Sequence, residues 1–365
     1  MKKLRIKRWS DWIDFTSGGI FAGIFGGDWR PSMSLKMTSC YGAHYKNTAT
    51  ERYIRKLKRF TGYESVALFS TGAEATEAFW RLCRVYYGKP DVWGGQVDPD
   101  EVGTESPQCD AMHGMTLGAL IMAGKLAYPG FRFGQSQETT GASIMEPYHA
   151  ASAQFYKESP TMERWRALYK EFGDSMGFCF DEIQGGFGRT GKLFGYEWYG
   201  IKPDFVTIGK ACGGGFPVSA LLGPKRIMES KVVKEHGHLH STHSGHPVMC
   251  HIASQVIDKI VDENLIQASY EKGLILHKLL EGLPVRHHSG KGLISGIEMK
   301  TPEQADKVVS ICRDSGLLAV STGRKWVKIG PPLNIPEDEL KAGTSILVQA
   351  VQDVVEKEVL IPEVL

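Results

Sequence analysis

Three features with chemical potential follow short apolar runs of the chain. Lys210, Asp181 and the segment Thr71–Glu74 each come at the end of a run that predicts a buried strand. Ligands of α/β sheets bind beyond the carboxyl ends of the strands, so we expect the three features to face one site. Taken singly, each has a plain structural explanation: a surface lysine, a turn-capping carboxylate and a capped helix start.

The residue types define the chemistry that a shared site would support. A lysine that loses solvent has a lowered pKa and becomes a nucleophilic neutral amine. Thr71 and Glu74 have the spacing of a capping box, and Gly72 would leave the first helix amides open to an anion. Asp181 precedes the glycine-rich run 182–191, which suits close approach to a ligand. An amine, a carboxylate and an anion cradle together are what pyridoxal 5'-phosphate (PLP) requires.

Short strands that alternate with helical stretches must position these groups. Apolar runs predict strands at 66–70, 177–180, 205–208 and 218–222. This alternation predicts an α/β domain with a largely parallel sheet. A long amphipathic helix over 251–263 leads into a second α+β region. We therefore expect an N-terminal segment that packs with the small domain, a large domain and a small C-terminal domain, at residues 1–45, 46–250 and 251–365.

The composition is that of an ordinary globular protein. The 365 residues include 43 Lys and Arg against 41 Asp and Glu, which gives a formal charge of +2. A charge so near zero argues against general electrostatic binding to nucleic acid or acidic membranes. No apolar run approaches the ~18–20 residues of a membrane helix. The seven cysteines form no CxxC motif, so we expect a soluble, cytoplasmic protein with no nucleic-acid or membrane partner.

Two longer motifs around the carboxylate and the lysine carry a family resemblance. The run 180–192 reads FDEIQGGFGRTGK, and the run 207–217 reads TIGKACGGGFP. Both resemble segments of the class III PLP-dependent aminotransferases of fold type I, and the 29-residue separation between Asp181 and Lys210 fits the same pattern. The resemblance covers the chain from about residue 9 to its C-terminus. It implies an α/β PLP-transferase fold, with a mostly parallel sheet in a large domain and a smaller α+β C-terminal domain.

The resemblance also implies a set of cofactor contacts. Lys210 would form the Schiff base with PLP and then move the substrate proton, while Asp181 would keep the ring nitrogen protonated. Thr242 matches a threonine that reaches the phosphate of the neighbouring subunit, which implies a homodimer with shared active sites. The other implied contacts are Thr71, Gly72 and Ala73 on the phosphate, Met112 and His113 beside the ring, Ile183 on the ring face, and Gln184 near the phenolic oxygen.

Two positions depart from the family pattern. Met112 stands where the family has an aromatic residue before His113, and sulfur–aromatic contact would retain part of the stacking. Lys328 stands where many members carry a carboxylate-binding arginine, with Arg324 nearby as an alternative. Lysine offers a point charge instead of a bidentate fork, so it would hold a substrate carboxylate less rigidly. The alternative, in which both residues are solvated and touch no substrate, stays equally open. Glu146 matches a family glutamate near the site.

These observations predict an aminotransferase that moves an amino group from an amine or ω-amino acid to a 2-oxo acid in two half-reactions. The run Ser244–Pro247 resembles that of ω-amino-acid and amine transaminases, in which the carboxylate-binding arginine is often missing. This resemblance and the departure at Lys328 favour amine and ω-amino donors. A fold-type I aminomutase of the glutamate-semialdehyde kind would share every cofactor residue. A zinc hydrolase is the alternative from a different class, because histidines recur at 236, 238, 240, 243, 246 and 251. No acidic partner accompanies those histidines, so we predict no metal.

Overall fold

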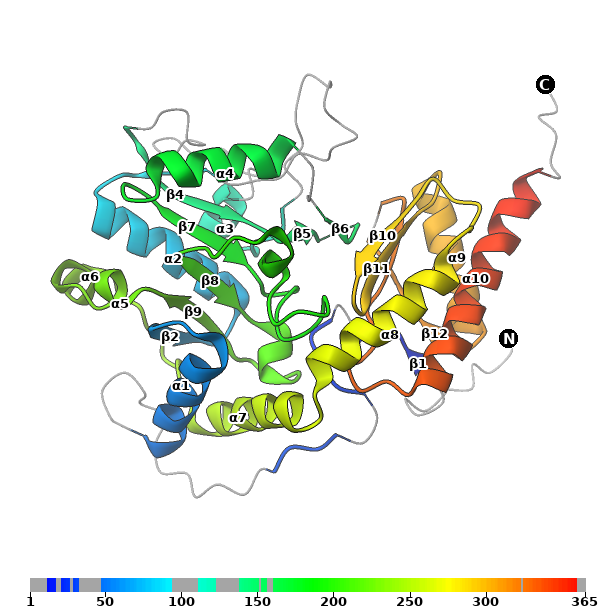
Figure 1. Cartoon of the computed structure of the whole chain (residues 1–365), viewed down its shortest axis with the longest axis horizontal. Helices are drawn as coiled ribbons and strands as arrows, with labels where there is room; N and C mark the ends of the chain where they lie inside the picture. The colour runs from blue at the N-terminus through cyan, green and yellow to red at the C-terminus, as the bar shows by residue number, and fades with distance from the viewer. Residues whose placement is uncertain are drawn as a thin grey trace, which may run out of the picture.

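Two groups of elements make up the chain in the computed structural model (Figure 1). The larger group surrounds a six-stranded sheet, and the smaller group contains the C-terminal helices. Helix α7 (Pro247–Asp262) continues into α8 (Leu265–Leu280), which reaches the smaller group. The structure describes residues 12–17, 21–26, 29–32, 47–93, 111–122, 138–150, 152–155, 160–322 and 324–359.

The large sheet has one antiparallel strand in an otherwise parallel arrangement. Its strands are β2 (Ser65–Phe69), β3 (Asp91–Trp93), β4 (Thr140–Met145), β7 (Gly177–Asp181), β8 (Phe205–Ile208) and β9 (Ser219–Gly223). The strand order is β2-β9-β8-β7-β4-β3, and only β9 runs antiparallel to its neighbours. β4 and β7 are buried along their whole length, as expected for strands that helices cover on both faces. The prediction of an α/β fold with a mostly parallel sheet is confirmed.

Helices flank this sheet. They are α1 (Thr48–Thr61), α2 (Gly72–Tyr87), α3 (Leu117–Met122), α4 (Pro160–Phe172), α5 (Lys225–Met228) and α6 (Lys231–His236). α2 packs against β8, β9 and β4 through buried residues that include Phe79 and Leu82. Its N-terminus is held by the Thr71 cap. It ends at Gly88, whose φ of 68° is a left-handed conformation that favours glycine.

Short elements complete the larger group. The strands β5 (Tyr148–His149) and β6 (Gln154–Phe155) form a hairpin. Two 3-10 turns, η3 (Gly195–Tyr199) and η4 (Lys210–Gly213), follow β7 and β8 along the chain. α7 packs against both α1 and η4, so it contacts the segment that follows β8.

The smaller group is an antiparallel sheet with helices on it. Its strands are β10 (His287–Lys291), β11 (Ile294–Glu298), β13 (Val320–Ser321) and β14 (Trp326–Ile329), in the order β10-β11-β14-β13. Its helices are α8, α9 (Pro302–Asp314) and α10 (Glu337–Val359). The N-terminal strand β1 (Ile13–Asp14) pairs in parallel with β12 (Leu317–Leu318), so residues from both ends of the chain meet in this group.

The four strands predicted from apolar runs lie within one residue of β2, β7, β8 and β9. The apolar pattern places Asp181 just after the strand at 177–180, whereas in the structure Asp181 is the last residue of β7. The helix predicted over 251–263 begins four residues earlier, because Pro247 fits the first turn of a helix. The predicted domain boundary at residue 250 falls inside α7, and the one at residue 45 lies outside the described residues.

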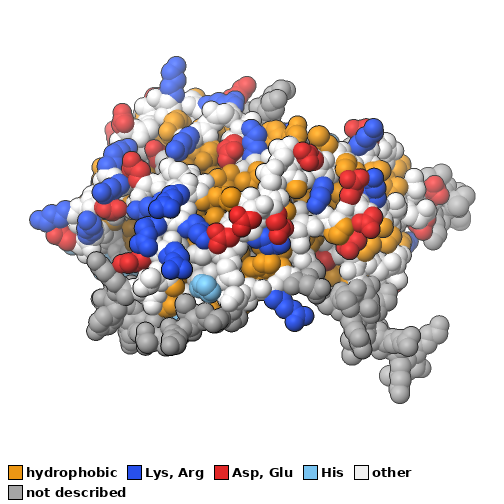
Figure 2. Space-filling model, turned by 60° about the horizontal axis from the view of Figure 1, so that its bottom comes forward, with side chains coloured by type: hydrophobic (Ala, Val, Ile, Leu, Met, Phe, Trp, Pro, Cys, Tyr) orange, Lys and Arg blue, Asp and Glu red, His pale blue; other side chains and the backbone are white. Residues whose placement is uncertain are grey.

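Acidic and basic side chains are intermixed on the face that Figure 2 shows, in line with the small net charge. Within the described ranges, no helix combines the length and the apolar character that crossing a bilayer needs. The described cysteines are all buried free thiols: Cys83, Cys179, Cys212, Cys250 and Cys312.

Candidate active site

The ends of β7 and β8 meet the start of α2 at one edge of the sheet. Asp181 pairs in register with Thr207 of β8, and Lys210 lies two residues beyond the end of that strand. A methyl group built on Gly209 would lie 3.3 Å from Ile183 Cγ2 and 3.7 Å from Gly72 Cα. The three features singled out in the sequence are therefore brought together, with Gly209 and Gly72 allowing the close contact.

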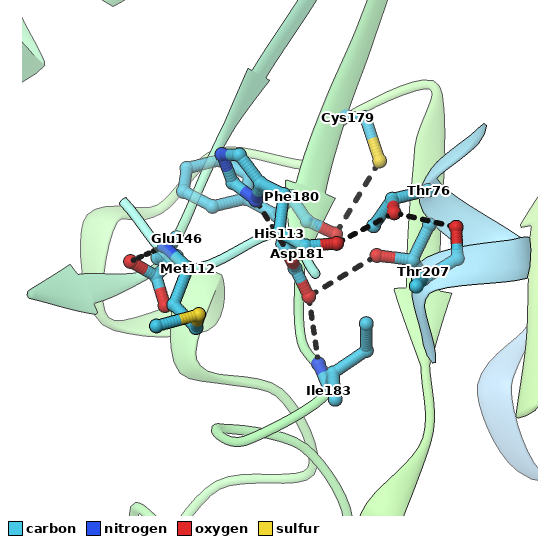
Figure 3. A network of polar contacts seen from close by, with 10 residues as sticks. Thr76, Met112, His113, Glu146, Cys179, Phe180, Asp181, Ile183 and Thr207 are labelled. Carbon is cyan, nitrogen blue, oxygen red and sulfur yellow. Dashed lines mark hydrogen bonds and ion pairs between the residues drawn. The ribbon is translucent and has the colours of Figure 1, made fainter. Parts of the chain in front are cut away.

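Asp181 is a buried carboxylate that accepts hydrogen bonds at both oxygens (Figure 3). Its Oδ1 accepts from the Ile183 amide at 3.1 Å and from the Thr207 hydroxyl at 3.3 Å. Its Oδ2 lies 2.7 Å from His113 Nδ1. These three contacts fix the orientation of the carboxylate. The Nε2 atom of His113 is buried and has no partner among the described residues.

Lys210 begins η4 in a left-handed backbone conformation, with a φ of 42°. A non-glycine residue pays steric strain in this region, and such strain concentrates at functional sites. Burial lowers the pKa of the Lys210 ammonium, while the negative charges of Asp181 and Glu146 oppose that shift. The pKa is thus brought nearer to neutrality, and the proportion of nucleophilic amine is larger than for a solvated lysine.

The start of α2 forms a compact, capped N-terminus. The Thr71 hydroxyl accepts from the Glu74 amide at 3.3 Å, and the Glu74 carboxylate accepts from the Thr71 amide at 2.8 Å. Next to this cap, a methyl group on Gly72 would lie only 2.6 Å from Ile183 Cδ1, so a larger residue would have to displace the Ile183 side chain. The early amides of a helix lack partners within the helix and point toward the open end. This terminus therefore suits an anion.

Glu146 and Met112 lie to one side of Asp181 in Figure 3. The Met112 amide donates to Glu146 Oε2 at 3.3 Å, which ties the residue before His113 to the end of β4. The Glu146 side chain is buried, and this burial raises its pKa, while His113 and Lys328 counteract the shift. The Met112 side chain is 46% exposed.

Lys328 in β14 is one of the two candidates for a substrate carboxylate, and it is buried, with an exposed fraction of 2%. Its Nζ donates to the Ala150 carbonyl and to Gln184 Oε1. The interpretation in which Lys328 is solvated is wrong. Arg324 is only partly buried and lies in the turn before β14. Through its hydrogen bond to Gln184, Lys328 connects the smaller sheet to the segment after Asp181.

Thr242 is exposed, in the turn that precedes α7. The histidines of the same region do not form a metal centre: within the described residues, no group of three or more His, Cys, Asp and Glu side chains is placed to hold an ion. The neighbouring Gly245 carbonyl instead accepts a hydrogen bond from Thr50 at 2.6 Å, which attaches this turn to α1.

Sequence reasoning assigned no role to Arg189, although the residue stands within the FDEIQGGFGRTGK motif. Its guanidinium is buried and donates to the carbonyls of Leu293 and Pro331 and to the Ser17 hydroxyl. Arg189 thus connects the glycine-rich run to the N-terminal segment, to the start of β11 and to the segment after β14. Glu182, also without a predicted role, accepts from the two amides that open η3.

The residues at this edge fit PLP. They supply an amine at Lys210, an oriented carboxylate at Asp181 and a helix start at which Gly72 packs closely against Ile183. The buried, unpartnered Nε2 of His113 leaves a polar atom beside the carboxylate. These are the donor types that an amine-reactive aldehyde with a ring nitrogen and a phosphate needs.

This chain is similar to several known aminotransferases. Residues 131–351 match the family model of class-III aminotransferases. An acetylornithine aminotransferase of Clostridium acetobutylicum is 27% identical, over 96% of this chain and 94% of that protein. An ornithine aminotransferase of Macrococcus caseolyticus is 30% identical, over 79% and 75%. The ornithine aminotransferase structure of Toxoplasma gondii, described with partial occupancy of PLP at its active site, matches with a TM-score of 0.78 at 22% identity, over 95% and 87%.

The solved structures confirm the prediction of a fold-type I architecture, and the family match excludes the zinc-hydrolase alternative. A match over more than half of the chain, together with relatives at 30% identity, supports one assignment. The chain belongs to the class III aminotransferases and is a PLP-dependent transaminase.

Proposed function

We propose that this transaminase moves an amino group from an ω-amino acid or amine to a 2-oxo acid, with PLP held at the edge where β7, β8 and α2 meet. The observation that carries the proposal is the convergence of Lys210, Asp181 and Gly72 at this edge. Similar proteins are named for ornithine and acetylornithine, and both of these molecules carry an amino group at the end far from the carboxylate. This similarity supports an ω-amino donor.

Two side chains would do the central work. PLP, when bound, supplies an aldehyde that reacts with amines and a ring that withdraws electrons. Lys210 Nζ would bind the aldehyde at rest, and once displaced by the donor it would take the proton from the donor carbon and return it. Asp181 would hold a proton on the ring nitrogen, because its carboxylate is buried and fixed by His113 and Ile183.

The other proposed cofactor contacts come from residues at the α2 terminus and around Asp181. The Thr71 hydroxyl and the amides of Gly72 and Ala73 would bind the phosphate at the α2 terminus. Ile183 already packs against Gly72 and would cover one ring face, with Met112 and His113 beside the ring and Gln184 near its phenolic oxygen. The exposed Thr242 would reach the phosphate of a second subunit, so we propose a homodimer with shared sites.

On the substrate side, we propose that the acceptor carboxylate lies against Lys328, with Arg324 as the alternative. An ammonium group has three N–H donors, and the Ala150 carbonyl and Gln184 use two of them. Burial lowers the pKa of Lys328, and Glu146, buried beside Met112, would oppose that shift. We also propose a cytoplasmic location, since the described cysteines are all free thiols.

Lys210→Ala tests the cofactor assignment. We expect the purified variant to lose both the visible absorbance of bound PLP and turnover with any donor, while its far-UV circular dichroism stays that of the wild type. Lys192→Ala, which removes a lysine from the end of the motif that holds Asp181, serves as the control and should keep both signals. Normal turnover in Lys210→Ala would contradict the assignment.

A donor panel tests the reaction class. The wild-type enzyme is given a fixed 2-oxo acid with an α-amino acid, an ω-amino acid or a diamine, and the amino acid formed from the acceptor is quantified. We expect turnover to require both partners and to favour ω-amino acids and amines. Isomerisation of a single substrate without an acceptor would instead identify an aminomutase.

A further inference from the structure

Lys328 is buried, and its ammonium group contacts polar and aromatic groups from several parts of the chain. Its Nζ donates to the Ala150 carbonyl and to Gln184 Oε1. The same atom lies over the rings of Phe21 and Tyr148, at 5.1 and 5.6 Å from their centroids. Two oxygen acceptors and two aromatic faces are the surroundings of a bound ammonium ion, so the position of this cation is fixed.

The surroundings of Lys328 lower its pKa, and one carboxylate opposes that shift. Burial lowers the pKa of Lys328, and the nearby cations Lys210 and Arg189 act in the same direction. The carboxylate of Glu146 opposes them and raises the pKa of Lys328. The phenol of Tyr148 also faces the ammonium, but burial raises the pKa of Tyr148 well above its usual range, so it stays neutral.

A protonated lysine constrains the Gln184 side chain. An ammonium group can donate hydrogen bonds but cannot accept them, so only the carbonyl oxygen of an amide can face it. The Gln184 oxygen is directed at Lys328 Nζ, and the NH2 group on the same planar carbon is therefore directed elsewhere. The charged neighbour thus dictates the orientation of the amide.

We propose that Lys328 is a positioning residue, which holds the Gln184 amide so that its N–H donors face the phenolic oxygen of PLP. The proposal rests on the proposed function, because it takes Gln184 to lie near that oxygen. Lys328 comes from β14 of the smaller sheet, and Gln184 follows β7 of the larger one. The two groups of elements would thus be coupled at the cofactor by one hydrogen bond.

The consequence is a measurable shift in the titration of the bound cofactor. The visible absorbance of PLP bound to a lysine changes with pH when the proton shared with the phenolic oxygen leaves. A donor aimed at that oxygen favours its charged form, so it lowers the pH midpoint. Removing one charge-assisted hydrogen bond is expected to raise the midpoint by about one to two pH units.

The experiment titrates the absorbance of the holoenzyme, without substrate, between pH 5 and 10. Lys328→Met should raise the midpoint by about one to two units, whereas Lys328→Arg, which keeps a charged donor, should restore most of the wild-type value. Lys307→Met, at an exposed position of α9, is the matched control and should not move it. A Lys328→Met midpoint equal to that of the control would overturn the proposal.

Gln184→Leu separates positioning from a direct charge effect. This variant loses the N–H donors, so its midpoint should rise as far as that of Lys328→Met, and adding Lys328→Met to it should cause no further shift. An equal further shift in the double variant would show that the lysine acts directly through its charge, and would overturn the positioning role. So would an unchanged midpoint in Gln184→Leu, which keeps the test decisive even if Lys328→Met fails to fold. A wild-type protein that shows no visible band with PLP would instead contradict the proposed function.

Discussion

Met112 is a single residue on which cofactor retention is expected to depend. The family resemblance places an aromatic residue at this position, and in the structure the methionine side chain is 46% exposed while its amide is held by Glu146. The backbone position is therefore fixed, and only the chemistry of the side chain has changed. A thioether makes contacts of ~0.3–1.5 kcal/mol with an aromatic ring, and ring stacking is worth about 0.5–1.5 kcal/mol beyond the buried area.

Met112→Phe is predicted to retain PLP more tightly than the wild type. The larger stacked area should lower the dissociation constant of PLP by about three- to ten-fold. Dialysis followed by measurement of the residual visible absorbance gives the comparison. Met115→Phe is the matched control, since Met115 is 77% exposed in the same segment and should leave retention unchanged. Equal retention in the wild type and Met112→Phe would show that the ring does not stack at this position.

How far the site could be predicted depends on the sequence distance between partners. Asp181 and Lys210 lie within motifs at strand ends, so their meeting follows from strand order alone. The burial of Lys328 depends instead on the pairing of β14 with β11 and on the Ala150 carbonyl, 178 residues away. No periodicity encodes such a contact. Arg189 was missed for the same reason, because its acceptors lie 104, 142 and 172 residues distant.

At the scale of elements, a pair of histidines joins α8 to β10. His277 Nε2 lies 3.1 Å from the Gly292 carbonyl, and its Nδ1 lies 3.1 Å from His288 Nε2. A carbonyl only accepts, so Nε2 of His277 carries the proton and Nδ1 of the neutral ring is the acceptor for His288. Protonation of His277 would set two N–H groups against each other. Burial lowers the pKa of His277 to about 4, and the neighbouring His288 contributes to the shift.

This pair predicts a loss of stability in acid. The pKa of His277 is lower in the folded chain than in the unfolded chain, so the stabilisation is present above the unfolded value and lost as the pH falls toward the folded one. The window runs from about pH 6.5 to about pH 4. The lowering corresponds to no more than about 3 kcal/mol in the free energy of unfolding.

Urea unfolding at several pH values checks this prediction. His277→Gln should flatten the decline between pH 6.5 and 4, because the titrating ring is gone. His236→Gln, at an exposed position on α6, should leave the wild-type profile unchanged. A decline of equal steepness in His277→Gln would assign the acid sensitivity to other groups.

The elements themselves were predictable where the apolar pattern was simple. Buried strands such as β7 and β8 are short apolar runs bounded by polar or glycine residues, so their limits could be placed within one residue. The antiparallel direction of β9 could not be read in this way, since an apolar run does not indicate which way a strand runs. The direction follows from the connection through η4, which turns the chain back along β8.

At the scale of the whole molecule, buried and partly buried polar contacts join segments from distant parts of the chain. The Ser17 hydroxyl donates to the Gly330 carbonyl and accepts from Arg189, and Asn334 accepts from the Gly26 amide. The N-terminal segment is thus fixed to the C-terminal group next to β14. Groups left unsatisfied in such a network cost about 1–3 kcal/mol each, so the network favours a single arrangement of these segments.

The proposed homodimer can be tested by complementation between inactive subunits. Thr242 is exposed, so Thr242→Glu should fold normally, and the added negative charge should repel the phosphate in the partner's site. Lys210→Ala is inactive in its own site but carries an intact threonine. When the two variants are unfolded together and refolded, half of the dimers should be mixed, and each mixed dimer should have one intact site. Activity should then recover to about a quarter of the wild-type value. Each variant refolded alone should stay inactive, and a mixture without activity would show that Thr242 does not serve the site of a second subunit.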